Sequence, residues 1–518
     1  MPPAVWAVTV LHTLVLALYS ALTPTYQAPD EPLHLDLVRV LAHGDGWPVH
    51  GTRLLDRQID ASFAVVDFDA AVRGEGLDAD APPRSTRPAF AELGPSRPVT
   101  VGGFNQLTQH PPGYYVVAAA VLRGLERLGA AAWPFDRVVG ALRLLSVVLL
   151  APLPLLAHAA ARRLGAAAPV AVAAALFPVA IPQLSHVGAS INNDVLLVAL
   201  CAVETLLLVR VACGDLSLRT ALLVGVVAGA ALLTKGLALV VVPWIAVAYA
   251  VAAVRATARG EALLRGAVAL AVAVVTGGWW WLRNLVVTGR VLPAVDAPSP
   301  VPGPGFDPNP LGWAVVWLRN FQQTFWGHFG WLTAEVPIAL VWGAAVLTAA
   351  GVAAAVVGSR GSAWRRPDLL VVLLPGVALS AGLALQSWLD HVATGVYRAI
   401  QGRYAFAGVT GLGVAVALGY GTVERGRRWL PVGVLAAAGV LQLVGLGTIL
   451  AHFWPLPGGL GASLAGALAW SPWPTAVPVA VGVAAAAAAV GVAVLVVRDP
   501  TAAEAENLIA MHEDLLRR

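Results

Sequence analysis

Hydrophobic residues occur along this chain in long runs, separated by shorter stretches of polar residues. The first run, Val5–Leu22, has about the length that a helix needs to cross a lipid bilayer. Further apolar runs lie at about 138–160, 170–187, 195–211, 221–233, 237–254, 267–285, 336–357, 369–389, 404–420, 430–451 and 477–497. The pattern predicts an all-α polytopic membrane protein with about 12 transmembrane helices.

Two stretches predict special elements at the membrane surface. Residues 221–254 are too many for one crossing and contain a single charge, so we expect a tight hairpin with Thr234-Lys235-Gly236 at its tip. The apolar stretch Gly113–Leu122, in contrast, is too short to span the bilayer. It is predicted to form a juxtamembrane helix on or partly in the outer leaflet.

Arginine in the short connections sets the expected orientation, because cytoplasmic loops are enriched in positive charge. With the N-terminus inside, the basic connections on the cytoplasmic side are 162–163, 210–219, 255–265, 360–366 and 425–428. Residues 23–137 and 286–335 then form two long extracytoplasmic loops, and the first contains the juxtamembrane helix. We expect one membrane domain over residues 1–498 and a short cytoplasmic amphipathic tail over residues 499–518.

Composition supports this class of protein. The chain of 518 residues is 58% hydrophobic and 12% charged, about half the charged fraction of soluble proteins, and its mean hydropathy is +0.75. No basic residue precedes the first run and no small-residue cleavage site follows it, so we expect a retained helix rather than a signal peptide. A net charge of +4 does not suggest a nucleic acid as partner. Cys201 and Cys213 lie at either end of one apolar run and are not expected to pair.

An acidic pair, Asp30 and Glu31, follows the first predicted helix just outside the hydrocarbon. Adjacent residues on a helix face different partners, so one can act as a general base while the other orients it or accepts a hydrogen bond. The same residues also make a good helix start with Asp30 as N-cap. From the residues alone, capping and catalysis are equally well supported.

Basic residues on the same predicted face suggest a phosphate site. Lys235 is the single lysine among 33 basic residues, which favours a specific role, since ammonium and guanidinium groups are not interchangeable. Arg283 and Arg403 lie at the outer ends of predicted spans, where an arginine fork can bind phosphate. The alternatives are snorkelling for the lysine and membrane anchoring for the arginines. Ionisable residues gathered at one membrane face indicate a functional site.

For His110 and for Asp194, the sequence leaves two interpretations open in each case. His110 either contacts a phosphate or sugar hydroxyl or is a solvated loop residue, and Asp194 either caps its helix or belongs to the site. Arg143, just inside the second span, is expected to pair with an outer carboxylate. Glu204 lies deeper, and we expect it to pair within the helix bundle.

A series of short motifs runs in order from about residue 5 to residue 420. The motifs are PDEPLH, HPPGYY, ARRLG, INNDVLL, LLTKG, WWWLRN, FWGHFGW and QGRYAF. Their succession resembles the GT-C superfamily of integral-membrane glycosyltransferases, and is most similar to bacterial relatives of the protein O-mannosyltransferases (glycosyltransferase family 39) and of the aminoarabinose transferases. The resemblance implies a GT-C-like helix bundle in the bacterial cell membrane, with its active site on the extracytoplasmic face.

The resemblance also implies an activity: inverting transfer of a monosaccharide (a hexose or a pentose) from a polyprenyl-phosphate donor, with an acidic residue of the first external loop as base. Carried over to this sequence, Asp30 is the base and Glu31 its neighbour. The substrate-binding residues suggested in this way are His34, His110, Tyr114, Asn193, Asp194, Lys235, Arg283, Trp326, His328, Gln401, Arg403 and Tyr404.

The expected partners are the polyprenyl-phosphate sugar, membrane lipid, and a lipid, glycan or protein acceptor. No sizeable C-terminal external domain is evident, so small or membrane-embedded acceptors are expected rather than large folded proteins. No cofactor is assigned, and a requirement for a divalent cation stays open. Two other functions remain as alternatives: a transporter or flippase of the same lipid-linked sugar, and a catalytically silent GT-C-like scaffold.

Overall fold

The computed structural model describes residues 1–78, 81–293, 301–303 and 305–498. Within these residues ten helices are long and apolar enough to cross a membrane, and a bent pair of helices makes an eleventh span. A shorter apolar helix, Leu218–Leu232, lies among them. The predicted class, an all-α polytopic membrane protein with about 12 spans, is therefore confirmed. The predicted tail over 499–518 lies outside the described residues.

Apart from Gly459–Trp470, the helices of the bundle correspond to the apolar runs predicted from the sequence. They are α1 (Pro3–Leu22), α6 (Phe135–Leu150), α7 (Leu153–Arg163), α8 (Ala168–Leu176), α9 (Pro182–Gly188), α10 (Asn193–Ala212), α11 (Leu218–Leu232), α12 (Val241–Arg255), α13 (Arg259–Ala273), α14 (Trp279–Thr288), α16 (Ile338–Gly358), α17 (Arg366–Thr394), α18 (Val409–Tyr420), α19 (Leu430–Phe453), α20 (Gly459–Trp470) and α21 (Ala476–Val497). The long connections contain α2 (Glu31–His43), α3 (Arg57–Phe63), α4 (Phe68–Arg73), α5 (Gly113–Arg127), α15 (Pro310–Trp326), and the two-residue strands β1 (His328–Phe329) and β2 (Ala334–Glu335).

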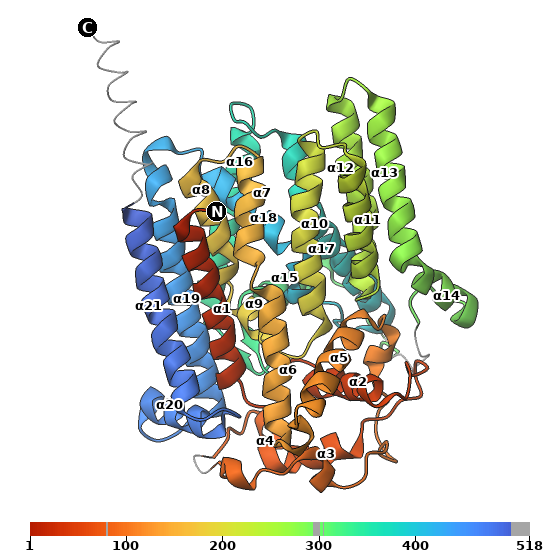
Figure 1. The fold of residues 1–518 in the computed structure, drawn as a ribbon, viewed down its shortest axis with the longest axis vertical. Helices are drawn as coiled ribbons and strands as arrows, with labels where there is room; N and C mark the ends of the chain where they lie inside the picture. The colour runs from red at the N-terminus through yellow and green to blue at the C-terminus, as the bar shows by residue number, and fades with distance from the viewer. Residues whose placement is uncertain (79–80, 294–300, 304, 499–518) are drawn as a thin grey trace.

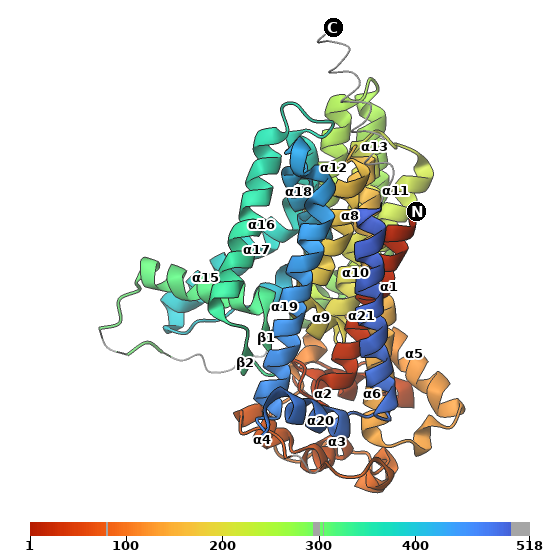
Figure 2. The ribbon, with the colours of Figure 1, turned by 90° about the vertical axis from the view of Figure 1, so that its left-hand side faces the viewer.

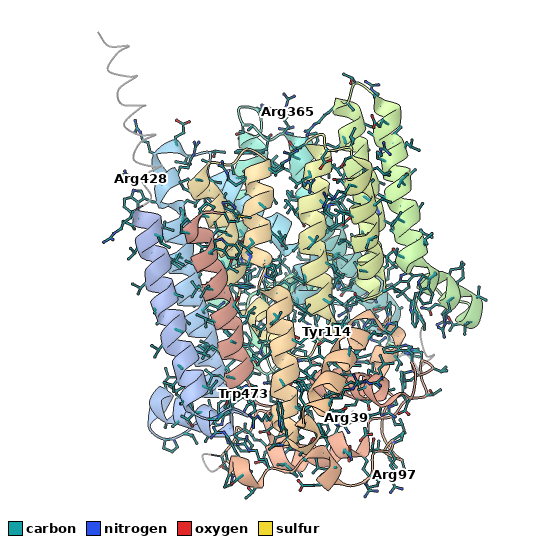
Figure 3. All side chains as sticks on the ribbon, viewed as in Figure 1. Arg39, Arg97, Tyr114, Arg365, Arg428 and Trp473 are labelled. Atoms are coloured by element: carbon teal, nitrogen blue, oxygen red, sulfur yellow. The ribbon has the colours of Figure 1, made fainter. Side chains whose placement is uncertain are left out.

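The long helices run side by side, and α2, α3, α4 and α5 cover one end of the bundle (Figure 1). Figure 2 shows α15 lying across the bundle axis and projecting from its side. Arg365 and Arg428, which belong to two of the predicted cytoplasmic connections, lie at the end opposite to α2–α5 (Figure 3). These two connections and the first long loop therefore lie at opposite ends of the bundle, and which end faces the cytoplasm stays a prediction.

The predicted hairpin and the predicted juxtamembrane helix both form, and they touch. Helix α11 ends at Leu232, and the chain turns at Lys235 into the short helix η7 (Gly236–Val240) that leads into α12. The N–H of Gly113, the first residue of α5, donates to the Leu233 carbonyl at 2.7 Å. A Cβ atom at this glycine would lie 2.4 Å from that carbonyl oxygen, so a side chain does not fit here. The contact brings the start of α5 against the turn that carries Lys235.

The apolar run 170–187 differs from its prediction as one straight span. The segments Ala168–Ala180 and Pro182–Gly188 are bent by 66° relative to each other. Pro178 and Pro182 account for the break, because proline lacks the amide donor that a continuous helix requires. The break places the short helix α9, with its polar residues, inside the bundle.

Candidate functional site

The turn between α1 and α2 has an unusual backbone conformation. Tyr26 and Asp30 have φ angles of 67° and 59°, in the left-handed region that bulky side chains rarely adopt and that aspartate tolerates better. Contacts hold Tyr26 there: its N–H donates to Glu31 Oε2 at 3.0 Å, and its carbonyl accepts the indole N–H of Trp331 at 3.0 Å. Strained backbone persists where its surroundings determine it, and here it sets the direction of the two carboxylates that follow.

Glu31 is completely buried, and its carboxylate is used by the fold. Arg143 on α6 donates to it twice, from Nε to Oε1 at 2.8 Å and from Nη2 to Oε2 at 2.6 Å. The N–H of Ile191 donates to Oε1 at 3.2 Å. The other hydrogen bonds of this guanidinium go to the carbonyl oxygens of Ser20, Thr23 and Pro24. The predicted pairing of Arg143 with an outer carboxylate is thus confirmed, and it closes Glu31 to other partners.

Asp30 has the opposite environment. Its side chain is 24% exposed, and its partner is Arg403, whose Nη2 lies 3.5 Å from Oδ2. Asp30 occupies the N-cap position of α2, but its side chain makes no capping hydrogen bond. Arg403 is buried, and its Nε and Nη1 have no hydrogen-bond partner among the described residues. The pair therefore retains both an accessible carboxylate and unused N–H donors.

Lys235 joins the same cluster through Tyr404. Its Nζ lies 4.9 Å from the centroid of the Tyr404 ring, and Arg403 Cζ lies 5.3 Å from it. Lys235 also donates to Asp194 Oδ1 at 2.7 Å, whereas Oδ2 of this carboxylate has no partner in the described part of the chain. We call Asp30, Asp194, Lys235, Arg403 and Tyr404 the polar cluster. Next to it, the amide of Asn193 donates to the Thr234 carbonyl at 3.4 Å.

His34 and the paired tyrosines of α5 border this cluster. The His34 ring stacks on Tyr115, and its Nδ1 lies 3.0 Å from the Tyr115 hydroxyl. Burial, assisted by the charges of Lys235 and Arg403, lowers the pKa of His34 well below its usual value, so the imidazole is neutral. The Tyr114 hydroxyl accepts the N–H of Asn192 at 3.1 Å, which ties α5 to the start of α10.

His110 and Gln401 carry polar atoms without partners. Nδ1 of His110 and Oε1 of Gln401 are buried and make no hydrogen bond within the described residues. Burial and the charge of Lys235 lower the pKa of His110 well below its usual value. An uncharged His110 can donate or accept one hydrogen bond to a ligand at this position.

Arg283 lies apart from the cluster. It is exposed on α14, with its Cζ 5.0 Å from the Trp280 ring and its Nη1 3.4 Å from the Asn284 side chain. The rings of Trp280, Trp47 and Tyr115 stand in series between Arg283 and His34, with centroid separations of 6.5 and 5.1 Å. Among the described residues, Arg283 therefore shares no ion pair or ring contact with Lys235 or Arg403.

Trp326 and His328 also lie outside the polar cluster. Trp326 ends α15 and packs against aromatic rings, and His328 Nε2 lies 3.4 Å from Glu335 Oε1 in the paired strand. The N–H of His328 donates to Gln183 Oε1 at 2.7 Å, and the N–H of Gly330 donates to His186 Nε2 at 3.3 Å. These two α9 residues hold the β1–β2 turn, a role that the sequence analysis missed.

Glu204 contradicts the expectation that it pairs within the bundle. It is buried in α10, and neither carboxylate oxygen has a hydrogen-bond partner among the described residues. Cys201 and Cys213 are free, as expected. No group of three or more His, Cys, Asp or Glu side chains able to hold a metal ion is found in the parts of the chain that the structure covers.

Comparison with known proteins gives one family and a set of distant structural matches. The sequence pattern of a family described as "Predicted membrane protein (DUF2142)" matches residues 13–410. No curated protein matches the chain.

Among solved structures, ArnT from Cupriavidus metallidurans matches in the apo state with 15% identity and a TM-score of 0.48, over 92% of this chain and 75% of that one. The same protein bound to undecaprenyl phosphate matches with 15% identity and a TM-score of 0.46, over 95% and 78%. The Archaeoglobus fulgidus oligosaccharyltransferase with a tethered acceptor peptide matches with 13% identity and a TM-score of 0.40, over 89% and 55%. Similarity at this level carries no information on substrate or mechanism.

Proposed function

The chain belongs to this family of predicted membrane proteins, and from its polar cluster we propose that it is a GT-C-type glycosyltransferase. It transfers a monosaccharide, with inversion, from a polyprenyl phosphate to an acceptor on the extracytoplasmic side of the bacterial cell membrane. The observation that carries the proposal is the guanidinium of Arg403. It is buried, it faces an accessible carboxylate at 3.5 Å, and its Nε and Nη1 are without partners among the described residues.

A phosphate group suits this guanidinium. Buried N–H donors without partners cost free energy, and a phosphate monoanion or diester oxygen supplies both charge and acceptors. Lys235 lies against the same tyrosine ring, so a second cation is available to the same group. Asp194 holds Lys235 in place and balances its charge within the polar cluster. Together these residues fit the phosphate of a lipid carrier and stabilise it as it leaves.

An apolar groove beside Arg403 suits the lipid chain. The groove has a volume of about 690 Å³ and lies between α15, α16, α17 and the start of α18. Its walls include Phe325, Trp326 and Ala405, and Ala405 follows Arg403 by two residues. In Figure 2 the helices that form it lie on the same side of the bundle. A polyprenyl chain in this groove would have its phosphate end at the polar cluster.

Asp30 is the proposed general base. The acceptor hydroxyl gives its proton to the Asp30 carboxylate, the acceptor oxygen bonds to the anomeric carbon, and the bond from that carbon to the carrier phosphate breaks. The electron pair of the broken bond stays on the phosphate, beside Arg403 and Lys235. Glu31 cannot serve as the base in this arrangement, because Arg143 occupies both of its oxygens.

The decisive experiment incubates membranes that contain the protein with a panel of radiolabelled polyprenyl-phosphate sugars. It measures which donor loses its label and which product gains it. We expect one donor to lose its label to an acceptor, and Asp30→Asn to abolish this loss while the protein remains folded. Transfer at the wild-type rate by the variant would overturn the assignment of the base. Absence of transfer from every donor, with labelled lipid accumulating in the opposite leaflet, would overturn the transferase itself.

Glu204 is the observation that favours a transporter as the second candidate. A buried carboxyl group without a partner, within a membrane-spanning helix, is the type of residue that marks ion and proton pathways. A flippase would move labelled lipid across the bilayer without an acceptor, and Glu204→Gln would slow this movement. In the transferase, the same substitution leaves the release of label unchanged, because Glu204 lies outside the polar cluster.

A further inference from the structure

Four arginines are buried in the described part of the chain, and three of them pair with a carboxylate. The pairs are Arg87–Asp136, Arg143–Glu31 and Arg403–Asp30. The fourth, Arg39 on α2, is only 6% exposed and has no carboxylate within ion-pair distance among the described residues. A buried charge is costly unless it is paired. Arg39 is therefore suited to bind an anionic ligand, because the described residues provide no carboxylate that pairs with it.

The contacts of Arg39 leave part of its guanidinium unused. Nη2 donates to Gln58 Oε1, and Cζ lies 3.9 Å above the ring of Phe90, while Nε has no partner in the described structure. Burial lowers the pKa of Arg39, and the charges of Asp56 and Glu126 act in the opposite direction without touching it. The aromatic ring holds the guanidinium in place but does not neutralise it.

Arg39 lies at the end of the bundle that α2–α5 cover (Figure 3), and it lines a pocket there. Its volume is about 220 Å³, and its walls come from α2, α3, α5 and the short segments around residues 90 and 130. The lining residues that matter are Arg39, His43, Gln58, Phe90, Glu126 and Trp133. Two aromatic rings, one buried cation and hydrogen-bonding groups therefore converge on one small space.

We propose that this space, the Arg39 pocket, binds the carboxylate-bearing sugar of an acidic glycan. The planar carboxylate matches the arginine fork, and Gln58 and Glu126 can bond the hydroxyl groups. The Glu126 carboxylate disfavours a doubly charged phosphate in the same space, so a singly charged carboxylate fits better. Phe90 and Trp133 offer apolar surface to the C–H face of a sugar ring.

Arg39 lies on α2, the helix that begins directly after Asp30. Arg39 follows Asp30 by nine positions, which is about 13 Å of helix rise. A glycan held at Arg39 therefore reaches Asp30 only if it is longer than one sugar ring, so the acceptor would be an acidic oligosaccharide. As an acceptor site the pocket rests on the proposed function, whereas its binding of an acidic sugar can be measured without the donor.

The test measures binding of glucuronate, glucose and inorganic phosphate to the full chain in lipid nanodiscs by titration calorimetry. We expect glucuronate to bind at least tenfold more tightly than glucose or phosphate. Arg39→Gln should weaken the binding of glucuronate at least tenfold. Arg127→Gln, which changes an exposed arginine of α5, should leave this binding unchanged. Equal binding of glucuronate to wild type and Arg39→Gln would overturn the proposal, and so would phosphate binding as tight as glucuronate.

A second variant keeps the test valid if Arg39→Gln does not fold. Glu126→Gln removes a negative charge from the pocket wall and should tighten glucuronate binding about threefold, an effect that a purely structural glutamate would not produce. Unchanged or weaker binding by this variant would count against the pocket. Loss of sugar transfer with intact glucuronate binding would refute the proposed function alone, and intact transfer without glucuronate binding would refute the pocket alone.

Discussion

Two adjacent carboxylates at the start of α2 each face a buried arginine, and the two pairs differ in how completely they are satisfied. Glu31 and Arg143 bond each other twice, and the remaining N–H groups of Arg143 are taken up by three backbone carbonyls. Asp30 and Arg403 make a single 3.5 Å contact, and two nitrogen atoms of Arg403, Nε and Nη1, have no partner in the described structure.

The difference separates a structural ion pair from one that can act on a ligand. A fully bonded buried pair resists change, because removing one partner leaves a charge without compensation. A pair with free donors and an accessible carboxylate can accept a ligand without first breaking its own bonds. Neighbouring residues of the same charge therefore need not share a role, even when both lie next to arginine.

Asp30→Asn should have the largest effect on activity. Loss of a general base lowers the rate of transfer by about 10³-fold, measured as release of label from the polyprenyl-phosphate sugar. Asparagine tolerates the left-handed backbone at this position, so the midpoint of thermal unfolding should not change. A variant that is both inactive and unfolded would show that Asp30, like Glu31, belongs to the fold.

Glu31→Gln should have the largest effect on stability. It leaves the charge of Arg143 buried without an anion, which costs about 3–5 kcal/mol, measured by unfolding in detergent micelles. Glu75→Gln is the control, since its pair with Arg73 is exposed and should contribute little. If Glu31→Gln removed transfer and left stability unchanged, the roles of the two carboxylates would be exchanged.

Arg403→Gln should weaken binding of the carrier. Hydrogen bonds from a charged donor contribute about 1.5–3 kcal/mol, so affinity for undecaprenyl phosphate should fall by about 10- to 100-fold. Arg283→Gln is the matched control, because Arg283 lies on α14 outside the cluster. Equal losses in the two variants would indicate a general attraction of the basic surface for the lipid.

Lys235→Ala should have a smaller effect, about tenfold. Its ammonium group is already bonded to Asp194, and the single variant leaves that carboxylate uncompensated beside the carrier phosphate. The double variant Asp194→Asn, Lys235→Ala removes both charges. Recovery of affinity in the double variant would mean that Lys235 acts by neutralising Asp194, and continued weak binding would mean that it contacts the phosphate itself.

The sequence was sufficient for much of the fold and for the residue types of the site. Apolar runs of membrane length predict the spans, and one lysine within a long apolar stretch predicts the hairpin that carries Lys235. The arginine of QGRYAF and the acidic pair are recognisable from their positions at the ends of predicted spans. These features depend on short stretches of chain, so local pattern is enough to find them.

The contacts between distant segments could not be predicted in this way. Nothing local distinguishes Arg403, which reaches Asp30, from Arg283, which does not, because the difference depends on how α14 and the short helix Gly402–Gly408 pack. Arg39 had one local signal, since Asp36, Arg39 and His43 recur at helical spacing, but its lack of a carboxylate appears only in three dimensions. The break before α9 had a local signal in Pro178 and Pro182, although the run was predicted as one span. The polar residues that follow these prolines belong to the segment that enters the bundle.

The smallest expected effect concerns His34, which borders the polar cluster of Asp30 and Arg403. Its pKa is lowered in the folded protein by burial and by the neighbouring cations, so the unfolded chain binds a proton near pH 6.5 that the folded one does not. The contribution of His34 to the free energy of unfolding should therefore be constant above about pH 6.5. Below that pH it should fall by up to about 1.4 kcal/mol per pH unit. His34→Gln should make the unfolding free energy less dependent on pH over this range. Tyr115→Phe, which removes the hydroxyl partner and keeps the imidazole, should retain the wild-type slope. If His34→Gln retained it as well, His34 would be charged in the folded protein and would add a cation beside the polar cluster.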